Sequence, residues 1–201
     1  AAGSTLPGVD VYGVNGNGDR ATLHLNGDVA LNGDVRSYSH GVVDLHSGTL
    51  TATGYSLSFD GIGSVTQTGG HFATSSLYLS NGATMSFNLG DAVDLLSIDG
   101  SGTLLDEQAP LSLNSLSVSN GGVLHLGSFT GSGAVSNWGL KWAGDHSTYL
   151  DSLIVGNLLT GDSLQVFYDA GSNATYVTTS SSPVPEIDPA SGLTALSLAI
   201  E

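Results

Sequence analysis

The chain is organised as short segments in which apolar and polar residues alternate. Leu77 and Leu79, for example, flank Tyr78, and the same alternation recurs in the segments 85–89, 111–118 and 124–126. Period-two alternation is typical of β-strands that bury one face. Asn-Gly pairs separate many of these segments, and both residues tolerate positive φ, so each pair predicts a tight turn between strands. The pairs are Asn15-Gly16, Asn17-Gly18, Asn26-Gly27, Asn32-Gly33, Asn81-Gly82 and Asn120-Gly121.

Two internal repeats indicate how these strands are arranged. Residues 76–87 match residues 115–126, at an offset of 39 residues. The pentapeptide Leu-Asn-Gly-Asp-Val occurs at 25–29 and again at 31–35. Strands that repeat imperfectly between glycines are typical of a β-solenoid, in which each coil buries its apolar face against the next coil. We therefore predict an all-β, β-helix-like body over residues 1–135. The alternative is a β-sandwich or jelly roll, whose hairpins would also use Asn-Gly turns.

The pattern changes near residue 136. Tyr149, Leu150, Leu153, Ile154 and Leu158 recur at three- and four-residue spacing. This spacing predicts one short helix over roughly 147–158, with Ser147 or Thr148 as its cap and Asp151 in its first turn. Alternating segments at 163–168 and 175–179 predict a hairpin. We interpret residues 136–180 as a helix-plus-hairpin cap that covers one end of the solenoid, because an open end is an unpaired edge.

The ends of the chain carry further apolar alternation. Pro183, Pro185 and Pro189 predict an extended linker, so residues 181–201 form a Pro-rich linker and an apolar tail. In this tail Leu196, Leu198 and Ile200 alternate with small residues, and near the N-terminus Val9 and Val11 alternate with polar ones. Both segments are predicted strands that can add to the sheet edge of a neighbouring molecule.

Composition narrows the class of function. The 201 residues include 3 Lys+Arg and 18 Asp+Glu, which gives a formal net charge of −15. Three cations cannot displace the counterions of a nucleic acid, and they cannot hold the chain on an anionic membrane. The absence of Cys excludes disulfides and zinc–thiolate sites. A small share of charged residues with almost no Lys is common in surface and extracellular proteins of bacteria.

The C-terminal segment resembles the PEP-CTERM sorting signal of Gram-negative bacteria. Val184, Pro185 and Glu186 match its motif, although the next proline, Pro189, comes two residues late. Residues 63–72 are similar to the rungs of autotransporter-associated β-strand repeat proteins, and residues 165–177 to their closing hairpin. The resemblance implies export, with contact to a membrane only transiently while an exosortase-type peptidase processes the chain. It also implies a location outside a Gram-negative-type cell, at the cell surface or in the biofilm matrix.

Few residues suggest catalytic or metal-binding chemistry. Asp91, Asp94 and Asp99 cluster in sequence and are candidate Ca²⁺ ligands, since Ca²⁺ prefers carboxylate oxygens; otherwise they lie in solvated turns. Asp106 and Glu107 are adjacent, and paired carboxylates can hydrolyse glycosides. No histidine has a metalloprotease spacing, and no serine lies in a convincing nucleophile elbow. We therefore expect a protein that is not an enzyme and that needs no cofactor, with Ca²⁺ as the one candidate ion.

Trp138 and Trp142 are candidates for stacking on sugar rings, although such a pair more often forms the core of a cap. Taken together, these features predict an extracellular structural protein that self-assembles into fibres through its termini. Its expected partners are further copies of itself and an exopolysaccharide. The alternatives are a polysaccharide-binding surface module and a β-helical carbohydrate-active enzyme.

Overall fold

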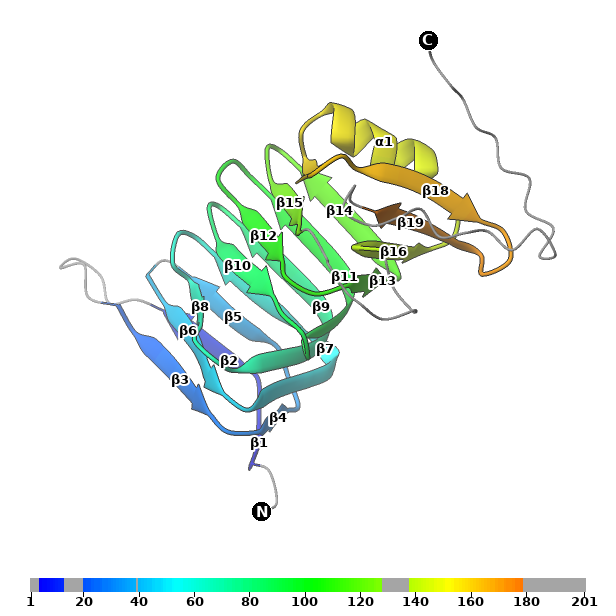
Figure 1. The fold of residues 1–201 in the computed structure, drawn as a ribbon. Helices are drawn as coiled ribbons and strands as arrows, with labels where there is room; N and C mark the ends of the chain where they lie inside the picture. Colours follow the sequence, from blue (N-terminus) through cyan, green and yellow to red (C-terminus); the bar gives the residue numbers. More distant parts are fainter. Residues whose placement is uncertain (1–3, 13–19, 39, 128–137, 179–201) are drawn as a thin grey trace, which may run out of the picture.

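The chain folds as a β-solenoid of about five turns, closed at one end by a helix and a hairpin (Figure 1). This computed structural model describes residues 4–12, 20–38, 40–127 and 138–178. All strand pairs up to β15 are parallel, and each joins one coil to the next. The all-β solenoid prediction is confirmed. The sandwich alternative is wrong, because such a fold would need antiparallel hairpins in the body.

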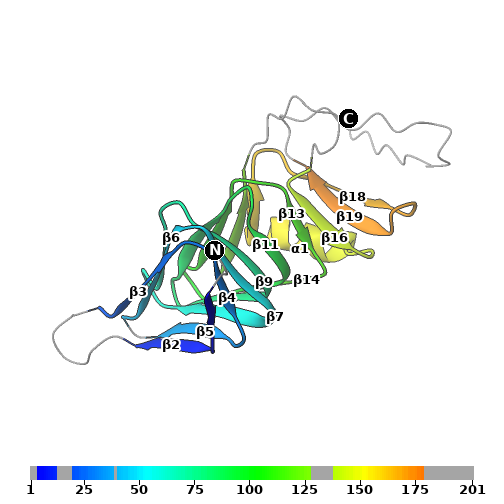
Figure 2. The same cartoon turned by 90° about the horizontal axis from the view of Figure 1, so that it is seen from below.

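Three sheets build the body, and a fourth joins it to the cap (Figure 2). The eight-stranded main sheet contains β1 (Ser4–Leu6), β2 (Val9–Tyr12), β4 (Val29–Leu31), β5 (Val35–Tyr38), β7 (Thr49–Asp60), β9 (His71–Ser80), β11 (Ala92–Asp99) and β14 (Ser115–Ser119). The other body strands are β3 (Thr22–Asn26), β6 (Val42–Ser47) and β8 (Val65–Gln67) in one sheet, then β10 (Thr84–Phe87), β12 (Leu104–Glu107) and β15 (Val123–Leu126) in the next. We call these last two sheets together the second face.

The 39-residue sequence repeat corresponds to two coils. Leu57, Leu77, Leu96 and Leu116 occupy one register position in β7, β9, β11 and β14. Long and short corners alternate along this stack. The corners after β7 and β11 have four residues each (61–64 and 100–103), whereas those after β9 and β14 have three (81–83 and 120–122).

The two kinds of corner are joined by a recurring clamp. Asp60, at the start of a long corner, accepts hydrogen bonds from the side chains of Ser80 (3.0 Å) and Asn81 (2.5 Å) in the next coil. Two coils further on, Asp99 accepts the same bonds from Ser119 (2.7 Å) and Asn120 (2.6 Å). These bonds hold the pKa of Asp99 below its ordinary value. The Asn81-Gly82 and Asn120-Gly121 pairs form the short corners with positive φ, as predicted, but each corner leads from the main sheet to the second face within one coil and does not close a hairpin.

The six-residue repeat marks two corners of a single coil. Asp28 Oδ1 accepts a hydrogen bond from the backbone N–H of Thr49 (3.0 Å), and Asp34 Oδ1 accepts one from the N–H of Ser56 (2.9 Å). The two Asn-Gly-Asp units therefore bind equivalent backbone groups of the following coil. This coil-to-coil bonding at the corners adds to the hydrogen bonds of the sheets.

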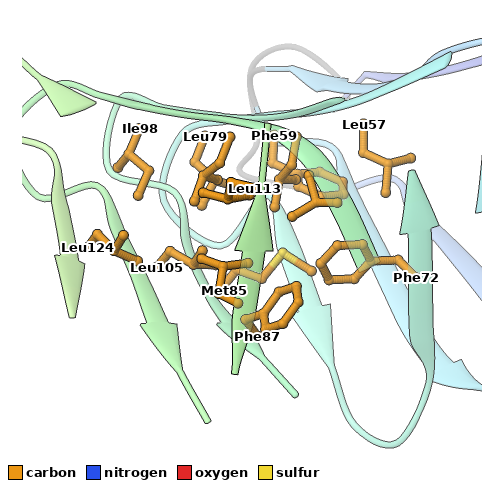
Figure 3. Close-up of a cluster of buried hydrophobic side chains, with 14 of the residues drawn as sticks. Leu57, Phe59, Phe72, Leu79, Met85, Phe87, Ile98, Leu105, Leu113 and Leu124 are labelled. Carbon is orange, nitrogen blue, oxygen red and sulfur yellow. The ribbon is translucent and has the colours of Figure 1, made fainter. Parts of the chain in front are cut away.

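The core lies between the main sheet and the second face. Leu57, Phe59, Leu79 and Ile98 project from the main sheet towards Met85, Leu105 and Leu124 of the second face (Figure 3). Each of these side chains is buried, and full burial of one such side chain stabilises the fold by about 1.5–3 kcal/mol. The apolar columns run through successive coils, so every coil depends on its neighbours for a complete core.

The cap continues this core and then ends the parallel stack. It comprises β16 (Leu140–Ala143), α1 (Ser147–Val155), β17 (Leu159–Gly161), β18 (Gln165–Asp169) and β19 (Ala174–Thr178). β16 pairs in parallel with β13 (Leu111–Leu113), and β17 pairs in parallel with β15. On the other edge of β16, β19 runs antiparallel and forms a hairpin with β18. The predicted helix-plus-hairpin cap is confirmed.

Details of the helix differ from the sequence prediction. It ends at Val155 instead of residue 158, and Asp151 lies beyond its first turn. Its N-cap position is His146, whose side chain makes no capping bond, while the carboxylate of Asp145 accepts bonds from the N–H and the hydroxyl of Ser147. Among the described residues, no helix has the length and hydropathy of a membrane span.

Candidate functional site

Polar side chains form rows across the outer surface of the second face. His24, Asp44 and Thr66 share one register position on β3, β6 and β8. Ser86, Asp106, His125 and Thr160 share the corresponding position on β10, β12, β15 and β17. Strands in a sheet lie about 4.8 Å apart, so each row presents closely spaced hydrogen-bonding groups along the solenoid axis.

Aspartates connect the members of these rows. Asp44 lies between its two neighbours: His24 Nδ1 is 2.9 Å from Oδ2, and the hydroxyl of Thr66 donates to Oδ1 over 2.9 Å. The bond from His24 is the main cause that holds the pKa of Asp44 below its ordinary value. Asp106 is bound in the same way by His125 Nδ1, over 2.7 Å. The rows therefore bind one coil to the next as well as facing solvent.

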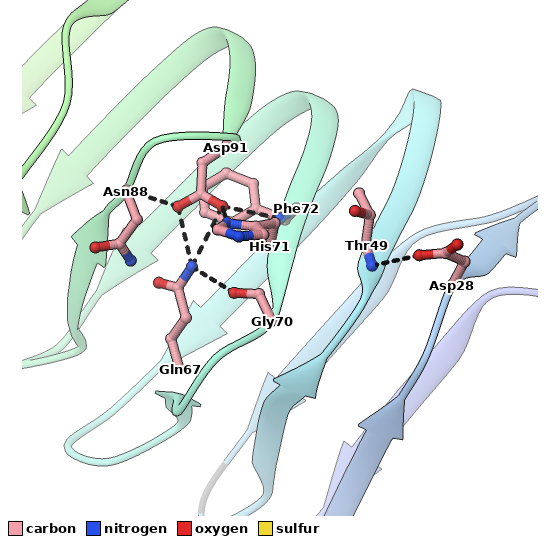
Figure 4. A network of polar contacts seen from close by, with 8 residues as sticks. All are labelled: Asp28, Thr49, Gln67, Gly70, His71, Phe72, Asn88 and Asp91. Atoms are coloured by element: carbon pink, nitrogen blue, oxygen red, sulfur yellow. Dashed lines mark hydrogen bonds and ion pairs between the residues drawn. The ribbon is translucent and has the colours of Figure 1, made fainter.

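A third carboxylate, Asp91, is buried in a network at the turn between β10 and β11 (Figure 4). It accepts bonds from the backbone N–H of Phe72 (3.0 Å) and Asn88 (2.7 Å). Its two oxygens also accept bonds from Nε2 of Gln67 (3.2 and 3.0 Å), and His71 Nδ1 lies 3.3 Å from Oδ1. These donors occupy the carboxylate, which makes Asp91 a structural link between three segments of the chain.

The structure does not gather the three candidate Ca²⁺ ligands. Asp91 is held by the network above, Asp99 by the clamp at its corner, and Asp94 lies between them on β11 with an exposed side chain. Within the described residues, no group of three His, Asp or Glu side chains is placed to hold a metal ion. Closeness in sequence is misleading here, because successive side chains of a strand point to opposite faces.

The same alternation separates Asp106 from Glu107. Asp106 faces outward, whereas Glu107 points inward at a register position that Phe87 and Leu126 occupy in the neighbouring coils. Glu107 is fully buried; its Oε1 accepts a bond from the N–H of Leu111 (3.1 Å), and its Oε2 has no hydrogen-bond partner among the described residues. Burial raises its pKa to about 9. The two carboxylates do not face each other as a hydrolytic pair would.

The tryptophans belong to the cap. Trp142 is 6% exposed; the ring of His146 stacks on its face at 3.8 Å between centroids, and Tyr149 packs edge-on at 5.6 Å. The indole N–H donates to the carbonyl of Asn114 over 3.1 Å. Stacking of sugar on Trp142 is therefore a wrong prediction, because its ring is packed in the cap. Trp138 is partly buried, and its ring packs edge-on against Tyr176 at 5.9 Å.

An open cleft of about 520 Å³ lies beside the start of α1. Its lining residues are Asp145, His146, Thr148, Tyr149 and Ser152. Tyr149 lines this cleft and is 37% exposed. Its hydroxyl is already engaged, because it accepts a hydrogen bond from the N–H of Val118 over 3.3 Å.

The predicted N-terminal strand is confirmed, and it lies within the solenoid. Val9 and Val11 lie in β2, which pairs in parallel with β5 of the same chain. Val11 is buried, so its side chain belongs to the core of the first coil. The sorting motif Val184, Pro185 and Glu186 and the tail residues Leu196, Leu198 and Ile200 lie outside the described residues.

Comparison with known proteins adds no relative: no family model, no curated protein and no solved structure matches this chain. The class is therefore defined by the fold itself. The chain is a parallel β-solenoid with a C-terminal helix-and-hairpin cap, and this fold is compatible with an extracellular structural or surface protein.

Proposed function

We propose that this chain is an extracellular structural protein of a bacterial surface or biofilm matrix, and that it assembles end to end. One observation carries the proposal: the two ends of the solenoid differ. At the C-terminal end, the antiparallel β19 and β18 end one sheet, and Tyr149 of α1 accepts a hydrogen bond from the N–H of Val118 on the edge strand β14. At the N-terminal end, β1, β2 and β3 are edge strands, each paired on one side only among the described residues. An unpaired edge is a template for a further strand.

The apolar tail supplies the strand that fits this edge. Leu196, Leu198 and Ile200 alternate with small residues, as a strand with one buried face requires. Pro183, Pro185 and Pro189 before them predict an extended spacer between β19 and this tail. A tail donated to the first coil of another copy makes a head-to-tail contact, and contacts of this type form filaments when the rotation does not close into a ring.

Charge sets the conditions of assembly. The net charge of −15 makes copies repel one another at low ionic strength. Two of the three cationic side chains, Arg20 and Arg36, lie in the first coils, close to the proposed acceptor edge. Added salt screens the overall repulsion, so we expect filaments to grow faster at about 0.15 M salt than at about 0.01 M.

Electron microscopy of three versions of the chain tests the proposal. The full chain is expected to form regular filaments, whereas a chain that ends at Ser182 is expected to remain as single particles. The triple variant Leu196→Ser, Leu198→Ser and Ile200→Ser retains the tail length but removes its apolar face, and it should also fail to polymerise. The matched control, Ala195→Ser with Ser197→Ala and Ala199→Ser, alters the alternate face and should polymerise normally. Filaments from the shortened chain would show that the tail is not the joint.

A further inference from the structure

The second face is interrupted between β8 and β10. β8 is the last strand of one sheet and β10 the first strand of the next, and no ladder joins them in the described structure. A depression of about 290 Å³ lies at this interruption. Its lining residues are Val65, Gln67, Thr84, Met85, Ser86, Leu104 and Asp106. We call this depression the slot.

Main-chain groups of both strands face the slot. The carbonyl of Ser64 accepts a hydrogen bond from the N–H of Val43 on β6 (2.9 Å). The N–H of Thr68 donates to the carbonyl of Leu45, also on β6 (3.1 Å). Residues 64, 66 and 68 thus bond towards β6, which turns the N–H and C=O groups of Val65 and Gln67 towards β10.

The main-chain groups of β10 alternate in the same way. The carbonyls of Ala83 and Phe87 accept bonds from Leu104 N–H (3.0 Å) and Gln108 N–H (2.7 Å) on the β12 side. The main-chain groups of Thr84 and Ser86 therefore point to β8. The slot thus receives donors and acceptors from two unpaired strand edges.

Hydrogen bonds fix the side chain of Gln67, one of the lining residues of the slot. The amide nitrogen of Gln67 donates to both oxygens of Asp91 and to the carbonyl of Gly70 (2.9 Å), which fixes the orientation of the amide. Its Oε1 is buried and has no hydrogen-bond partner among the described residues. The amide of Gln67 is therefore held in one orientation by its nitrogen, beside the main-chain groups that face the slot.

We propose that the slot is a binding subsite for one ring of a neutral polysaccharide. Sugar hydroxyls both donate and accept, which suits main-chain groups of both kinds, the hydroxyls of Thr84 and Ser86, and the carboxylate of Asp106. Leu104, which is partly buried, supplies the apolar contact that a ring also needs, whereas the side chains of Val65 and Met85 belong to the core. The volume suits a single ring, since pockets for larger ligands begin at about 300 Å³. Asp106 and the overall charge of −15 disfavour an acidic sugar.

Calorimetry with defined tetrasaccharides tests the proposal on the full chain. Cellotetraose, maltotetraose, mannotetraose and chitotetraose are the neutral probes, and tetragalacturonate is the acidic one. We expect at least one neutral probe to bind with a Kd of about 1 mM or tighter, and the acidic probe to bind at least about 10-fold more weakly. Hydrogen exchange should slow at Val65, Gln67, Thr84 and Ser86 when the probe is bound. This test does not depend on filament formation, because exchange can be measured in single particles and in filaments.

Two variants and one control complete the test. Ser86→Leu fills the slot and Thr84→Val removes a hydroxyl with little change of shape; each should weaken binding, the first by at least about 10-fold. Ser97→Leu places the same group on the outer surface of β11 and should leave Kd unchanged. Binding by none of the neutral probes, protection confined to the cap cleft, equal binding of the acidic probe, or an unchanged Kd in Ser86→Leu would each overturn the proposal.

Discussion

Glu107 makes this solenoid less stable as pH rises, and replacing it with Gln should remove the effect. The side chain is fully buried, and burial raises its pKa from an ordinary 4.5 to about 9. Between these values the folded chain keeps a proton that the unfolded chain releases. The stability that protonated Glu107 provides is therefore complete below pH 4.5 and is lost progressively as pH rises to about 9.

The magnitude follows from the size of the shift. Each pH unit above 4.5 lowers the free energy of unfolding by about 1.4 kcal/mol, so the loss at pH 7 is about 3 kcal/mol. Gln has nearly the same shape, and its Oε1 can still accept the bond from the N–H of Leu111. Because Gln carries no charge in either state, Glu107→Gln should be more stable than the parent at pH 7 by about 2–3 kcal/mol.

Urea unfolding at pH 5, 6, 7 and 8 measures this difference. The free energy of unfolding of Glu107→Gln minus that of the parent should grow with pH, by about 1.4 kcal/mol per unit. Taking this difference cancels the contributions of the other carboxylates. Asp106→Asn is the matched control, because it removes a neighbouring carboxylate that faces outward. A difference that stays constant from pH 5 to pH 8 would refute the reasoning, since it would mean that Glu107 is ionised in the fold.

Three further outcomes are expected. Asp91→Ala should cost about 2–4 kcal/mol in urea unfolding, because it removes the acceptor of two backbone N–H groups and one of the acceptors of the Gln67 amide. Asp94→Ala on the exposed surface should change stability by less than about 0.5 kcal/mol. Gly122→Ala should raise the unfolding rate in the absence of urea and lower the melting temperature far more than Gly54→Ala. The Cβ added at Gly122 would lie 2.7 Å from the backbone oxygen of Ile98. The Cβ added at Gly54 would meet open space, so only the φ of +83° opposes that substitution. Asp44→Asn should be less stable than the parent near pH 6 but equal to it at the lowest pH. The lowered pKa of Asp44 stabilises the fold above the ordinary value of 3.8, and this contribution disappears as pH falls through the folded-state pKa. An acid titration followed by circular dichroism measures the difference.

The sequence predicts the solenoid well because each coil depends on local patterns. Alternation marks the strands, and the Asn-Gly pairs at residues 81 and 120 mark two corners at which φ is positive. The match at 39 residues identifies a repeat, but it conceals that two coils lie within it. The coil between the two matching segments has a corner of four residues (100–103), whereas the matching segments have corners of three. This extra residue shifts the alignment, so the sequence does not match itself at an offset of one coil.

The sequence predicts much less of the polar networks and of the slot. The slot exists because two strands of neighbouring coils do not pair, and no residue type signals an absent ladder. Its neighbours in sequence predict Asp91 as a metal ligand, yet its partners Gln67 and Phe72 come from the preceding coil. The burial of Glu107 could be predicted from one feature of the sequence, because this charged residue occupies an inward position of an alternating strand.

The alternation of long and short corners determines how such a chain can change its length. An acidic corner residue meets a Ser-Asn pair in the next coil, so removal of one coil would bring two like corners together, either two aspartates or two Ser-Asn pairs. Removal or duplication of 39 residues preserves the pairing of aspartate with Ser-Asn at these corners and alters the length of the solenoid by about 10 Å, two strand spacings. Homologous chains should therefore differ by even numbers of coils, and gene duplication in this lineage has a natural unit that is twice the structural one.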